Sequence, residues 1–328
     1  MTQKSGSIGC VCITGGTGSF GSAFARFLLS LPTPPRIRIY SRDEHKQEDL
    51  ARALHDDRVT FILGDIRDGD RLRRALDGCD ALVHAAALKV VSQGEQHVTE
   101  FIGVNIQGSE EAALAAIEAG VLRSVLISSD KAVQPINHYG ACKMIAERVF
   151  IYANRLSVSR GLRFSVVRGG NVWGSRGSVV EVWREQRAAL KSIQVYNPDT
   201  TRFHLPMTDW CAFVWQALQE QRGGEIFAPK LRAWRLGDLA EAFGGAVESG
   251  DNRNGDKQDE MLIAPHEVKR TVDIGWAYAI EPPKDLRDVW NYQSYHVPVS
   301  YTKMFTGNQY GSDTVARLSV AELKELIK

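Results

Sequence analysis

The residues TGGTGSFG, at positions 14–21, stand between an apolar run and a helical pattern, and they decide the fold. In such a turn Gly15 permits the sharp change of direction, Gly18 lets the backbone approach a pyrophosphate, and Gly21 lets helix and strand pack closely. The N-terminus of the helix then offers N–H groups and a positive dipole end to phosphate. The alternative is a flexible glycine-rich loop, but the position between strand and helix favours a dinucleotide-binding turn. Its predicted cofactor-binding residues are Gly15, Thr17, Gly18, Ser19, Phe20 and Gly21.

The first half of the chain alternates short β-branched runs with helical patterns. This alternation predicts an α/β fold, a Rossmann-like doubly wound parallel sheet. The strands are nearly continuous apolar runs, as expected where both faces of a sheet are covered. The predicted strands are Gly9–Thr14, Arg36–Tyr40, Val59–Leu63, Ala81–His84, Ser124–Ser128 and Phe164–Arg168, and the predicted helices are Ser22–Leu31, Glu44–Leu54, Asp68–Leu76, Val104–Ala119 and Tyr139–Leu156.

Beyond about Arg168 the alternation becomes irregular, which predicts a second, smaller domain. We expect residues 6–177 to form the nucleotide-binding domain, with a later segment at about 200–222 returning to it, and residues 178–328 to bind mainly the substrate. The polar stretch Glu248–Glu260 is expected to be a loop. Further helices are predicted at Ser178–Leu190, Met207–Glu220 and Leu236–Phe243, and short strands at Ile193–Tyr196 and Glu225–Ala228.

Composition excludes several classes of protein. The 328 residues carry a net charge of +1, which gives no electrostatic footprint for nucleic acid or a membrane surface. The N-terminal residues lack the apolar core of a signal peptide, and no run approaches the length of a membrane span. The five cysteines form no CxxC pair, and Cys10 and Cys12 are expected to pack on one face of a strand. We therefore expect a soluble cytoplasmic protein with no metal site.

The end of the second predicted strand distinguishes between NAD and NADP. A carboxylate there binds the ribose hydroxyls, whereas an arginine accommodates a 2′-phosphate. Ser41 and Arg42 precede any acid, and Asp43 and Glu44 suit the start of the next helix. The sequence therefore favours NADP. After the third strand, Asp65 and Ile66 are predicted near the adenine, with a plain turn as the alternative.

Ser129 ends a predicted strand, and Tyr139 and Lys143 begin a helix shortly afterwards. The four-residue spacing places Tyr139 and Lys143 on one helical face. Tyrosine normally titrates near about 10, but a nearby cation would lower its pKa, so that Tyr139 could remove a hydroxyl proton. A solvent-exposed pair is the alternative, and the nucleotide-binding turn argues against it.

The chain resembles the extended short-chain dehydrogenase/reductases, and within them the inverting UDP-N-acetylglucosamine 4,6-dehydratases. The resemblance extends nearly from end to end, and its most specific parts are the Asp-Lys pair after the serine and the run NVWGSRGSV. The matching segments are TGGTGSFG at 14–21, YSRDE at 40–44, GDIRD at 64–68, HAAALK at 84–89, SSDKAVQP at 128–135, YGACK at 139–143, RGGNVWGSRGSV at 168–179, TRF at 201–203, GGEIFAPK at 223–230, DKQDEML at 256–262 and YGSDT at 310–314.

This resemblance implies oxidation of a sugar at C4 by hydride transfer to NADP, with Tyr139 as the base and Lys143 holding the ribose. Lys131 would then take the C5 proton and Asp130 would protonate the departing C6 hydroxyl, with C5 inverted in this branch of the family. For that chemistry Lys131 needs a lowered pKa, which nearby cations would provide, and Asp130 a raised one. The alternatives are a UDP-sugar 4-epimerase or dehydrogenase with Asp130 and Lys131 as a surface pair, or a non-catalytic nucleotide-binding regulator.

Other site residues are also implied by the resemblance, as is a homo-oligomer, either a dimer or a ring. Val90 and His204 depart from the family pattern, where a histidine and a tryptophan are usual, so they put the sugar preference and the inversion at C5 in question. Further cofactor contacts would come from Ala85, Ala86, Ala87, Lys89 and Asn105, and contacts to the UDP-sugar from Lys89, Asn171, Arg176, Gly177, Ser178, Val179, Arg202, Arg253, Lys257 and Glu260.

Overall fold

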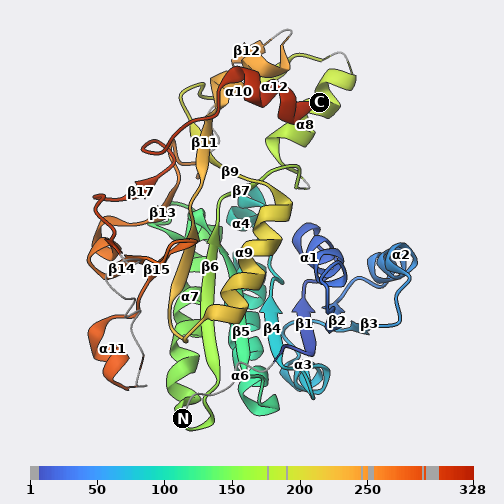
Figure 1. The fold of residues 1–328 in the computed structure, drawn as a ribbon. Coiled ribbons are helices and arrows are strands. Elements are labelled where there is room, and N and C mark those ends of the chain that lie inside the picture. Colours follow the sequence, from blue (N-terminus) through green and yellow to red (C-terminus); the bar gives the residue numbers. More distant parts are fainter. Residues whose placement is uncertain are drawn as a thin grey trace.

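The computed structural model of the protein describes residues 7–175, 177–189, 191–244, 247–249, 255–289, 292 and 303–328. A large sheet lies between two layers of helices, and a smaller region of short strands and helices lies beyond one end of it (Figure 1). The architecture is thus the α/β class that the sequence predicts.

The first half of the chain builds the parallel part of the sheet and most of its covering helices. The predicted strands and helices are all present, with boundaries that differ by a few residues. The elements are β1 (Cys10–Thr14), α1 (Ser19–Leu29), β2 (Arg36–Ser41), α2 (Glu44–Leu54), β3 (Val59–Leu63), α3 (Gly69–Leu76), β4 (Ala81–His84), α4 (Val91–Gln96), α5 (Val98–Phe101), the π-helix η1 (Ile102–Gln107), α6 (Gly108–Ala119), β5 (Arg123–Ser129), the short 3-10 helix η2 (Asp130–Ala132), α7 (His138–Leu156), a second 3-10 turn η3 (Val158–Arg160) and β6 (Arg163–Gly169).

Strand β1 shows why the parallel strands are apolar throughout. Cys10 and Cys12 pack into the core under α3, α6 and α7, whereas Val11 and Ile13 pack into the core under α1 and α9 (Met207–Glu220). Successive side chains of a strand point to opposite faces, and here each face is covered by helices. The prediction that Cys10 and Cys12 simply pack on one side is confirmed, and both are buried free thiols.

Within the described residues the main sheet has the order β16-β14-β15-β10-β6-β5-β4-β1-β2-β3. Pairing is parallel from β3 to β10 and antiparallel beyond β10. The strand order reverses between β1 and β4, and this is where doubly wound sheets place their ligand crevice. The remaining strands and helices of the chain are β7 (Asn171–Val172), α8 (Val179–Ala188), β8 (Ile193–Val195), β9 (Thr201–Leu205), β10 (Ile226–Pro229), β11 (Arg232–Arg235), α10 (Leu236–Phe243), β12 (Val247–Ser249), β13 (Met261–Ile263), η4 (Pro265–Arg270), β14 (Thr271–Asp273), β15 (Ala277–Ile280), α11 (Lys284–Val289), β16 (Lys303–Met304), β17 (Tyr310–Gly311) and α12 (Val320–Ile327).

The second half of the chain is divided between the main sheet and the smaller region. Helix α9 packs against α1 and the sheet, and β10, β14, β15 and β16 extend the sheet at one edge. The smaller region contains the sheet β11-β9-β7, the pair β12-β8 and a core of its own around Trp183, Trp234 and Leu239. Strands β14 to β16 were not predicted, because runs of two to four residues carry too little periodic signal.

The stretch Glu248–Glu260 departs from its expected loop at one end. Residues 248 and 249 belong to β12, which pairs in parallel with β8. Residues 250–254 lie outside the described residues, as does residue 190 at the end of the predicted helix Ser178–Leu190. Pairing with a distant strand is a tertiary effect, and local composition does not reveal it.

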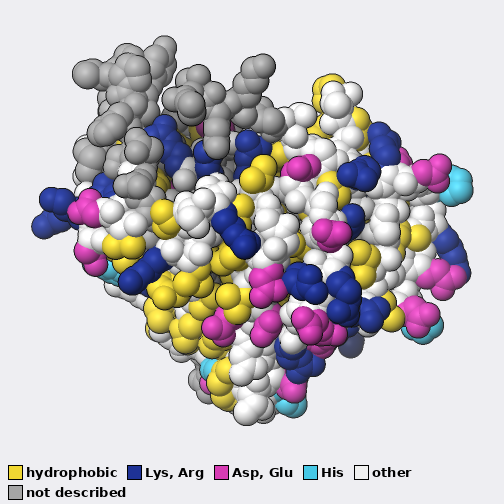
Figure 2. Space-filling view, turned by 90° about the horizontal axis from the view of Figure 1, so that it is seen from below, with side chains coloured by type: hydrophobic (Ala, Val, Ile, Leu, Met, Phe, Trp, Pro, Cys, Tyr) yellow, Lys and Arg dark blue, Asp and Glu magenta, His cyan; other side chains and the backbone are white. Residues whose placement is uncertain are grey.

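The surface agrees with the nearly balanced charge. On the face shown in Figure 2, basic and acidic side chains are interspersed over the described part of the chain. Among the described residues, no helix is both long and apolar enough to cross a membrane.

A buried charge cluster joins β6 to the helix that follows β5 and to the C-terminal half. Arg168 is 3% exposed and donates to both oxygens of Glu147 on α7, at 3.0 and 2.8 Å, and to both oxygens of Glu267 on η4, at 2.7 and 2.9 Å. It also donates to the Leu262 carbonyl at 2.9 Å. Burial alone would oppose the charge on Arg168, but the two carboxylates outweigh it and raise the pKa of the guanidinium.

Removing this cation should destabilise the protein strongly. Arg168→Met would leave two buried carboxylates without a counter-charge, so we expect the free energy of unfolding to fall by about 3–5 kcal/mol. Urea denaturation followed by circular dichroism measures the change. The control is Arg58→Met, which breaks the partly exposed pair with Asp56 and should lower the stability far less. Equal losses in the two variants would contradict the assignment.

Candidate active site

A cleft of about 1540 Å³ lies between the main sheet and the smaller region. It follows the carboxyl ends of β1, β2, β4, β5 and β6, where the connecting loops diverge on either side of the strand-order reversal. Most of the residues predicted for the site line it, and these are Gly15, Thr17, Gly18, Ser19, Phe20, Gly21, Ser41, Arg42, Asp65, Ile66, Ala85, Ala86, Ala87, Lys89, Ser129, Asp130, Lys131, Tyr139, Lys143, Asn171, Gly177, Ser178, Val179, Arg202 and Lys257.

The glycine turn after β1 has the geometry of a phosphate cradle. Gly15 has a φ of 64°, a left-handed conformation that favours glycine, and its N–H donates to the Tyr40 carbonyl at 2.8 Å. A Cβ on Gly15 would lie 2.7 Å from the Cα of Ala86, and one on Gly21 would lie 2.5 Å from the Cα of Gly16. No side chain caps α1 at its first residue, and its first turn carries no acid. The N-terminus of this helix is thus suited to an anionic group, and the residues present fit a dinucleotide.

The end of β2 forms the part of the cleft expected to hold the adenosine ribose. Ser41, Arg42 and Asp43 line the cleft, and Asp43 also caps α2 by accepting from the Lys46 N–H at 3.0 Å. The Ser41 hydroxyl accepts from Gln47 Nε2 at 3.0 Å, so the Arg42 guanidinium is the cation at this end of the strand. Asp65 also lines the cleft, but its carboxylate is held by Arg67 at 2.8 Å, and this ion pair lowers the pKa of Asp65.

Asn105 lies behind the cleft wall and not on it. It is fully buried, its Oδ1 accepts from the Leu88 N–H at 2.8 Å, and its Nδ2 donates to the Leu88 carbonyl at 2.8 Å. These two bonds fix the segment 85–89, which does line the cleft. The structure therefore gives Asn105 a supporting place behind the wall, in contrast to the direct cofactor contact that was expected.

The end of β5 and the start of α7 bring the candidate catalytic residues together. Asn137 caps α7 by accepting from the Gly140 N–H at 2.7 Å, and this fixes the first turn, on which Tyr139 lies. Tyr139 and Lys143 both face the cleft, and the Lys143 Nζ donates to the Ile127 carbonyl at 2.6 Å. The helical spacing thus delivers both side chains to the end of β5, as the sequence predicted.

Burial changes the acidities of Tyr139 and Lys143. It raises the pKa of Tyr139 to about 12, against the opposing effects of the Lys131 cation and of Ser129. Burial also lowers the pKa of Lys143 to about 8, although Glu147 opposes this. The Lys131 cation thus lowers the pKa of Tyr139, as expected of a nearby lysine, but desolvation of the phenolate outweighs it and the net pKa is raised.

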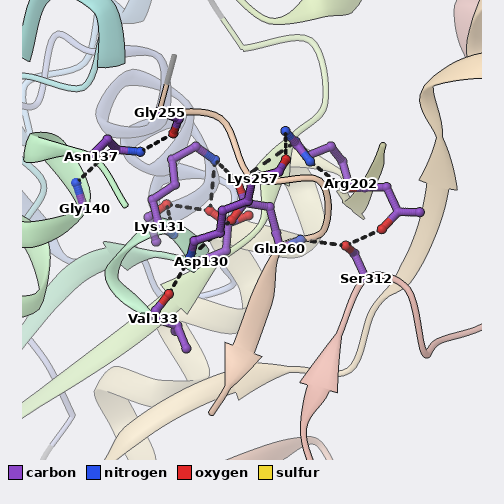
Figure 3. A network of polar contacts seen from close by, with 12 residues as sticks. Asp130, Lys131, Val133, Asn137, Gly140, Arg202, Gly255, Lys257, Glu260 and Ser312 are labelled. Atoms are coloured by element: carbon purple, nitrogen blue, oxygen red, sulfur yellow. Dashed lines mark hydrogen bonds and ion pairs between the residues drawn. The ribbon is translucent and has the colours of Figure 1, made fainter. Parts of the chain in front are cut away.

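Figure 3 shows a compact polar network around the residues that follow β5. The Lys131 Nζ lies 3.2 Å from Asp130 Oδ1 and 3.0 Å from Glu260 Oε1, and both carboxylate side chains are 1% exposed. The Ser129 hydroxyl donates to Asp130 Oδ1 at 2.7 Å, whereas Asp130 Oδ2 has no hydrogen-bond partner among the described residues. This second oxygen is therefore a buried acceptor without a hydrogen-bond donor within the described part of the chain.

The charge state of Lys131 differs from the expectation. Burial opposes its positive charge, but Asp130 and Glu260 outweigh burial and raise its pKa. The prediction of a lowered pKa, caused by nearby cations, is therefore wrong, because the closest charged groups are carboxylates. The Arg202 cation does lower the pKa of Lys131, as predicted, but its effect is smaller than that of either carboxylate.

The substrate side of the cleft is only partly as expected. Arg202 lines the cleft, but its guanidinium donates to the carbonyls of Lys257 and Gln258 at 2.9 and 3.0 Å, so it clamps the segment 255–260. Lys257 in turn donates to the Val133 carbonyl. Glu260 is absent from the cleft lining. Asn171, Gly177, Ser178 and Val179 line the cleft, whereas Arg176 and Arg253 lie outside the described residues.

Val90 and His204, two of the positions that depart from the family pattern, lie in different places. Val90 is 54% exposed and lines the cleft directly. His204 lies on β9 behind the wall, with its ring 5.0 Å from that of Trp173, and burial lowers its pKa. Val90 is thus placed to alter contacts in the cleft, while His204 alters the support of a neighbouring aromatic ring.

The sequence analysis missed several residues of the cleft wall. They carry no motif, and their aromatic members have the spacing of ordinary core residues in helices and short strands. Long-range packing brings them to the cleft, so no local signal could have identified them. They are Trp183, Gln186, Gln194, Tyr196, Asn197, Met207, Trp210 and Trp234.

A parallel sheet with a glycine phosphate turn, and a Tyr-x-x-x-Lys helix beside the end of β5, define an enzyme of the extended short-chain dehydrogenase/reductase class with a nicotinamide cofactor. The sequence profile of the polysaccharide biosynthesis protein family matches residues 11–282, and the chain belongs to this family.

The curated relatives carry two different activities in their names. An inverting UDP-N-acetylglucosamine 4,6-dehydratase from Campylobacter jejuni is 37% identical over 281 residues, which cover 85% of this chain and 84% of the relative. A UDP-glucose 4-epimerase from Rickettsia bellii is 37% identical over 324 residues, covering 96% of this chain and 94% of the relative. The chain is therefore similar to enzymes of both names.

The fold is similar to those of solved enzymes. Pen from Bacillus thuringiensis superposes with a TM-score of 0.87 at 30% identity, covering 97% of this chain and 96% of that one. DesIV, a dTDP-glucose 4,6-dehydratase from Streptomyces venezuelae solved with NAD bound, has a TM-score of 0.70 at 25% identity, covering 76% of this chain and 86% of that one.

The lowered pKa of Lys143 predicts a pH-dependent stability. In the unfolded chain the lysine titrates near its ordinary pKa of about 10.4, but in the folded protein it titrates near 8. Between these values the unfolded state binds more protons, so the contribution of Lys143 to the free energy of unfolding rises with pH. From about pH 7.5 to about pH 9.5, wild type should gain about 2 kcal/mol relative to Lys143→Met. Urea denaturation at several pH values tests this, and parallel pH curves for the two proteins would contradict it.

Proposed function

We propose that the enzyme is an NADP-dependent nucleotide-sugar 4,6-dehydratase that converts a UDP-hexosamine to its 4-keto-6-deoxy form. UDP-N-acetylglucosamine is the substrate proposed, on the strength of the Campylobacter relative. The observation that carries the proposal is the pair formed by Asp130 and Lys131. A buried carboxyl with one unpartnered oxygen lies 3.2 Å from an amine at the cleft wall, beside Tyr139.

Tyr139 and Lys143 serve the first step, in which the C4 hydroxyl is oxidised. The glycine turn at residues 15–21 and Lys143 would hold NADP in the cleft, where it would supply a hydride acceptor for C4 and a hydride donor for C6. Tyr139 accepts the proton of the C4 hydroxyl as the C4 ketone forms. Its pKa of about 12 means that it rests as a phenol, so a positive charge next to the ring is needed to favour the phenolate. Lys143 lies one helical turn further along α7 and is placed to hold the ribose.

Asp130 and Lys131 serve the elimination. One proton passed from Lys131 to Asp130 turns the ion pair into a neutral amine beside a carboxylic acid. Burial favours this neutral form, whereas the charge of Glu260 opposes it, so the pair rests as an ion pair. Lys131 then takes the C5 proton, made acidic by the C4 ketone. The C5–C6 double bond forms, the C6–O bond breaks, and Asp130 supplies the proton with which the hydroxyl leaves as water. Addition of hydride to C6 and of a proton to C5 then saturates the C5–C6 double bond, and the face from which the proton arrives decides the configuration at C5.

The second candidate is a UDP-sugar 4-epimerase, which the Rickettsia relatives favour because they cover nearly the whole chain. An epimerase uses the same tyrosine and lysine but has no need of an acid–base pair at Asp130 and Lys131. The two activities differ at C6, because only a dehydratase produces a methyl group there.

Arg42 supports NADP over NAD, since Asp43 is engaged in capping α2 and leaves the guanidinium at the ribose end of the cleft. We also propose, from the family resemblance, that the enzyme is a cytoplasmic homo-oligomer.

The decisive test is proton NMR of the purified protein with UDP-N-acetylglucosamine and a trace of NADP in deuterated buffer. We expect a new 6-methyl signal, deuterium at C5 and no accumulation of reduced cofactor, and the ring couplings will report the configuration at C5. A galacto-configured sugar that retains its C6 hydroxyl would instead establish the epimerase. Unchanged substrate would rule out UDP-N-acetylglucosamine, and other UDP-sugars would be tried in turn.

A matched variant of the acid isolates the elimination step. Asp130→Asn keeps the shape of the side chain but cannot supply the proton, so the formation of the 6-methyl product should fall by about 10²–10⁴-fold. Oxidation at C4 should persist, so reduced cofactor is expected to accumulate. Loss of both steps together would contradict the separate role given to Asp130.

Cofactor preference has its own test at Arg42. Arg42→Ala removes the guanidinium expected to meet the 2′-phosphate, so the affinity for NADP should fall by about tenfold or more while that for NAD changes little. Isothermal titration with each cofactor measures both constants. Equal losses for the two cofactors would mean that Arg42 does not recognise the 2′-phosphate.

A further inference from the structure

Glu260 is a buried carboxylate in direct contact with the proposed base. It comes immediately before β13, and two hydrogen bonds to Ser312 fix its backbone. The Glu260 N–H donates to Ser312 Oγ at 2.9 Å, and the Ser312 N–H donates to the Glu260 carbonyl at 2.8 Å. The side chain is 1% exposed and is absent from the cleft lining, whereas Lys131 does line the cleft. Glu260 therefore lies behind Lys131 as seen from the cleft.

The contacts of Glu260 are with cations (Figure 3). Its Oε1 lies 3.0 Å from the Lys131 Nζ and 4.0 Å from the Arg202 Nε, and its Oε2 lies 3.8 Å from the Lys257 Nζ. Lys131 thus forms one ion pair with Asp130, on its own turn, and another with Glu260, which lies more than a hundred residues later in the sequence.

The segment 255–260 is fastened to the catalytic turn by further bonds. Asn137 Nδ2 donates to the Gly255 carbonyl at 2.7 Å, and Lys257 donates to the Val133 carbonyl. Arg202 donates to the carbonyls of Lys257 and Gln258 from the other side. These bonds hold Glu260 in place independently of its ion pair, which is what a group that orients another side chain requires.

We propose that Glu260 is a positioning residue, which aims the Lys131 amine at C5 of the sugar and holds it charged until Asp130 receives its proton. The inference rests on the proposed dehydratase function, in which Lys131 is the base. Glu260 acts through Lys131 and does not itself touch the substrate.

The charges around Lys131 determine what removal of Glu260 would do. Burial opposes the ammonium, and the two carboxylates are the groups that favour it. Without the charge of Glu260, Asp130 alone would oppose burial, so Lys131 would lose its proton at lower pH. The ionisable groups that face Lys131 are Asp130 on η2, Tyr139 on α7, Arg202 on β9, and Lys257 and Glu260 on the segment 255–260.

The test uses exchange of the C5 proton, which depends on Lys131 without hydride transfer. UDP-4-keto-6-deoxy-N-acetylhexosamine and NADP are incubated with the enzyme in deuterated buffer, and NMR follows deuterium at C5 as a function of pH. The rate should rise with pH as Lys131 becomes neutral. In Glu260→Gln we expect this rise to occur about one pH unit or more lower than in wild type. In Glu260→Asp, which keeps the charge but has a shorter reach, the rise should stay close to its wild-type position while the maximal rate falls about tenfold.

The matched control is Asp259→Asn, which removes a charge from the same segment. Asp259 accepts from Thr201 Oγ1 at 2.6 Å, and an amide oxygen can keep that bond. We expect its pH profile to match wild type, with thermal unfolding and NADP affinity checked for every variant. A rise at the same pH in Glu260→Gln and wild type would overturn the positioning role, as would an equal shift in Asp259→Asn. Absence of exchange in wild type would instead refute the dehydratase function itself.

Discussion

The Lys131 ammonium held between two buried carboxylates is the interaction on which the site depends. Asp130 and Glu260 are each 1% exposed, and a buried carboxylate without a counter-charge would be strongly destabilising. Lys131 supplies that counter-charge, but only if the segment 255–260 lies against the turn after β5. Burial of charge thus requires two distant parts of the chain to pack together, and both of them line the cleft.

A second buried ion pair joins the C-terminal half of the chain to the parallel sheet. Glu267 on η4 is paired with Arg168 at the end of β6, while Glu260 precedes β13 and is paired with Lys131 after β5. The C-terminal half is therefore fastened to the parallel sheet by two buried ion clusters, one on each side of β13. Glu147 adds a link to the catalytic helix, because it binds both Arg168 and the Ser128 hydroxyl, the latter at 2.6 Å. The positions of α7 and of the end of β5 are consequently set by the same cluster.

Much of the fold was predictable because its signals are local. Each of three signals can be read from a short stretch of sequence: the strand–helix alternation, the turn at 14–21 and the spacing of Tyr139 and Lys143. The structure places the corresponding elements where these short stretches predict them. The charge states were not predictable in this way. The chemistry implied by the resemblance required cations near Lys131, but the decisive neighbour, Glu260, is a carboxylate that comes from far along the chain. The degree of burial of Tyr139 likewise depends on the completed fold. Arg202 and Asn105 show the same limit, since each matched a ligand position yet binds backbone carbonyl or amide groups of its own chain.

The pairing also explains how one buried site can hold both an acid and a base. If Lys131 and Asp130 were to exchange protons with solvent separately, a charge would have to form in a desolvated environment at each step. Transfer of one proton across the 3.2 Å between them leaves the total charge of the pair unchanged. The acid and the base therefore arise together, and their combined state is independent of pH over the range in which the pair keeps a single proton. Burial raises the pKa of Glu260 itself. Where Glu260 is ionised, its negative charge on the far side of Lys131 opposes this transfer and widens that range at its alkaline end. Glu260 thus makes the proton transfer from Lys131 to Asp130 less favourable, but it extends the pH range over which the pair keeps its single proton.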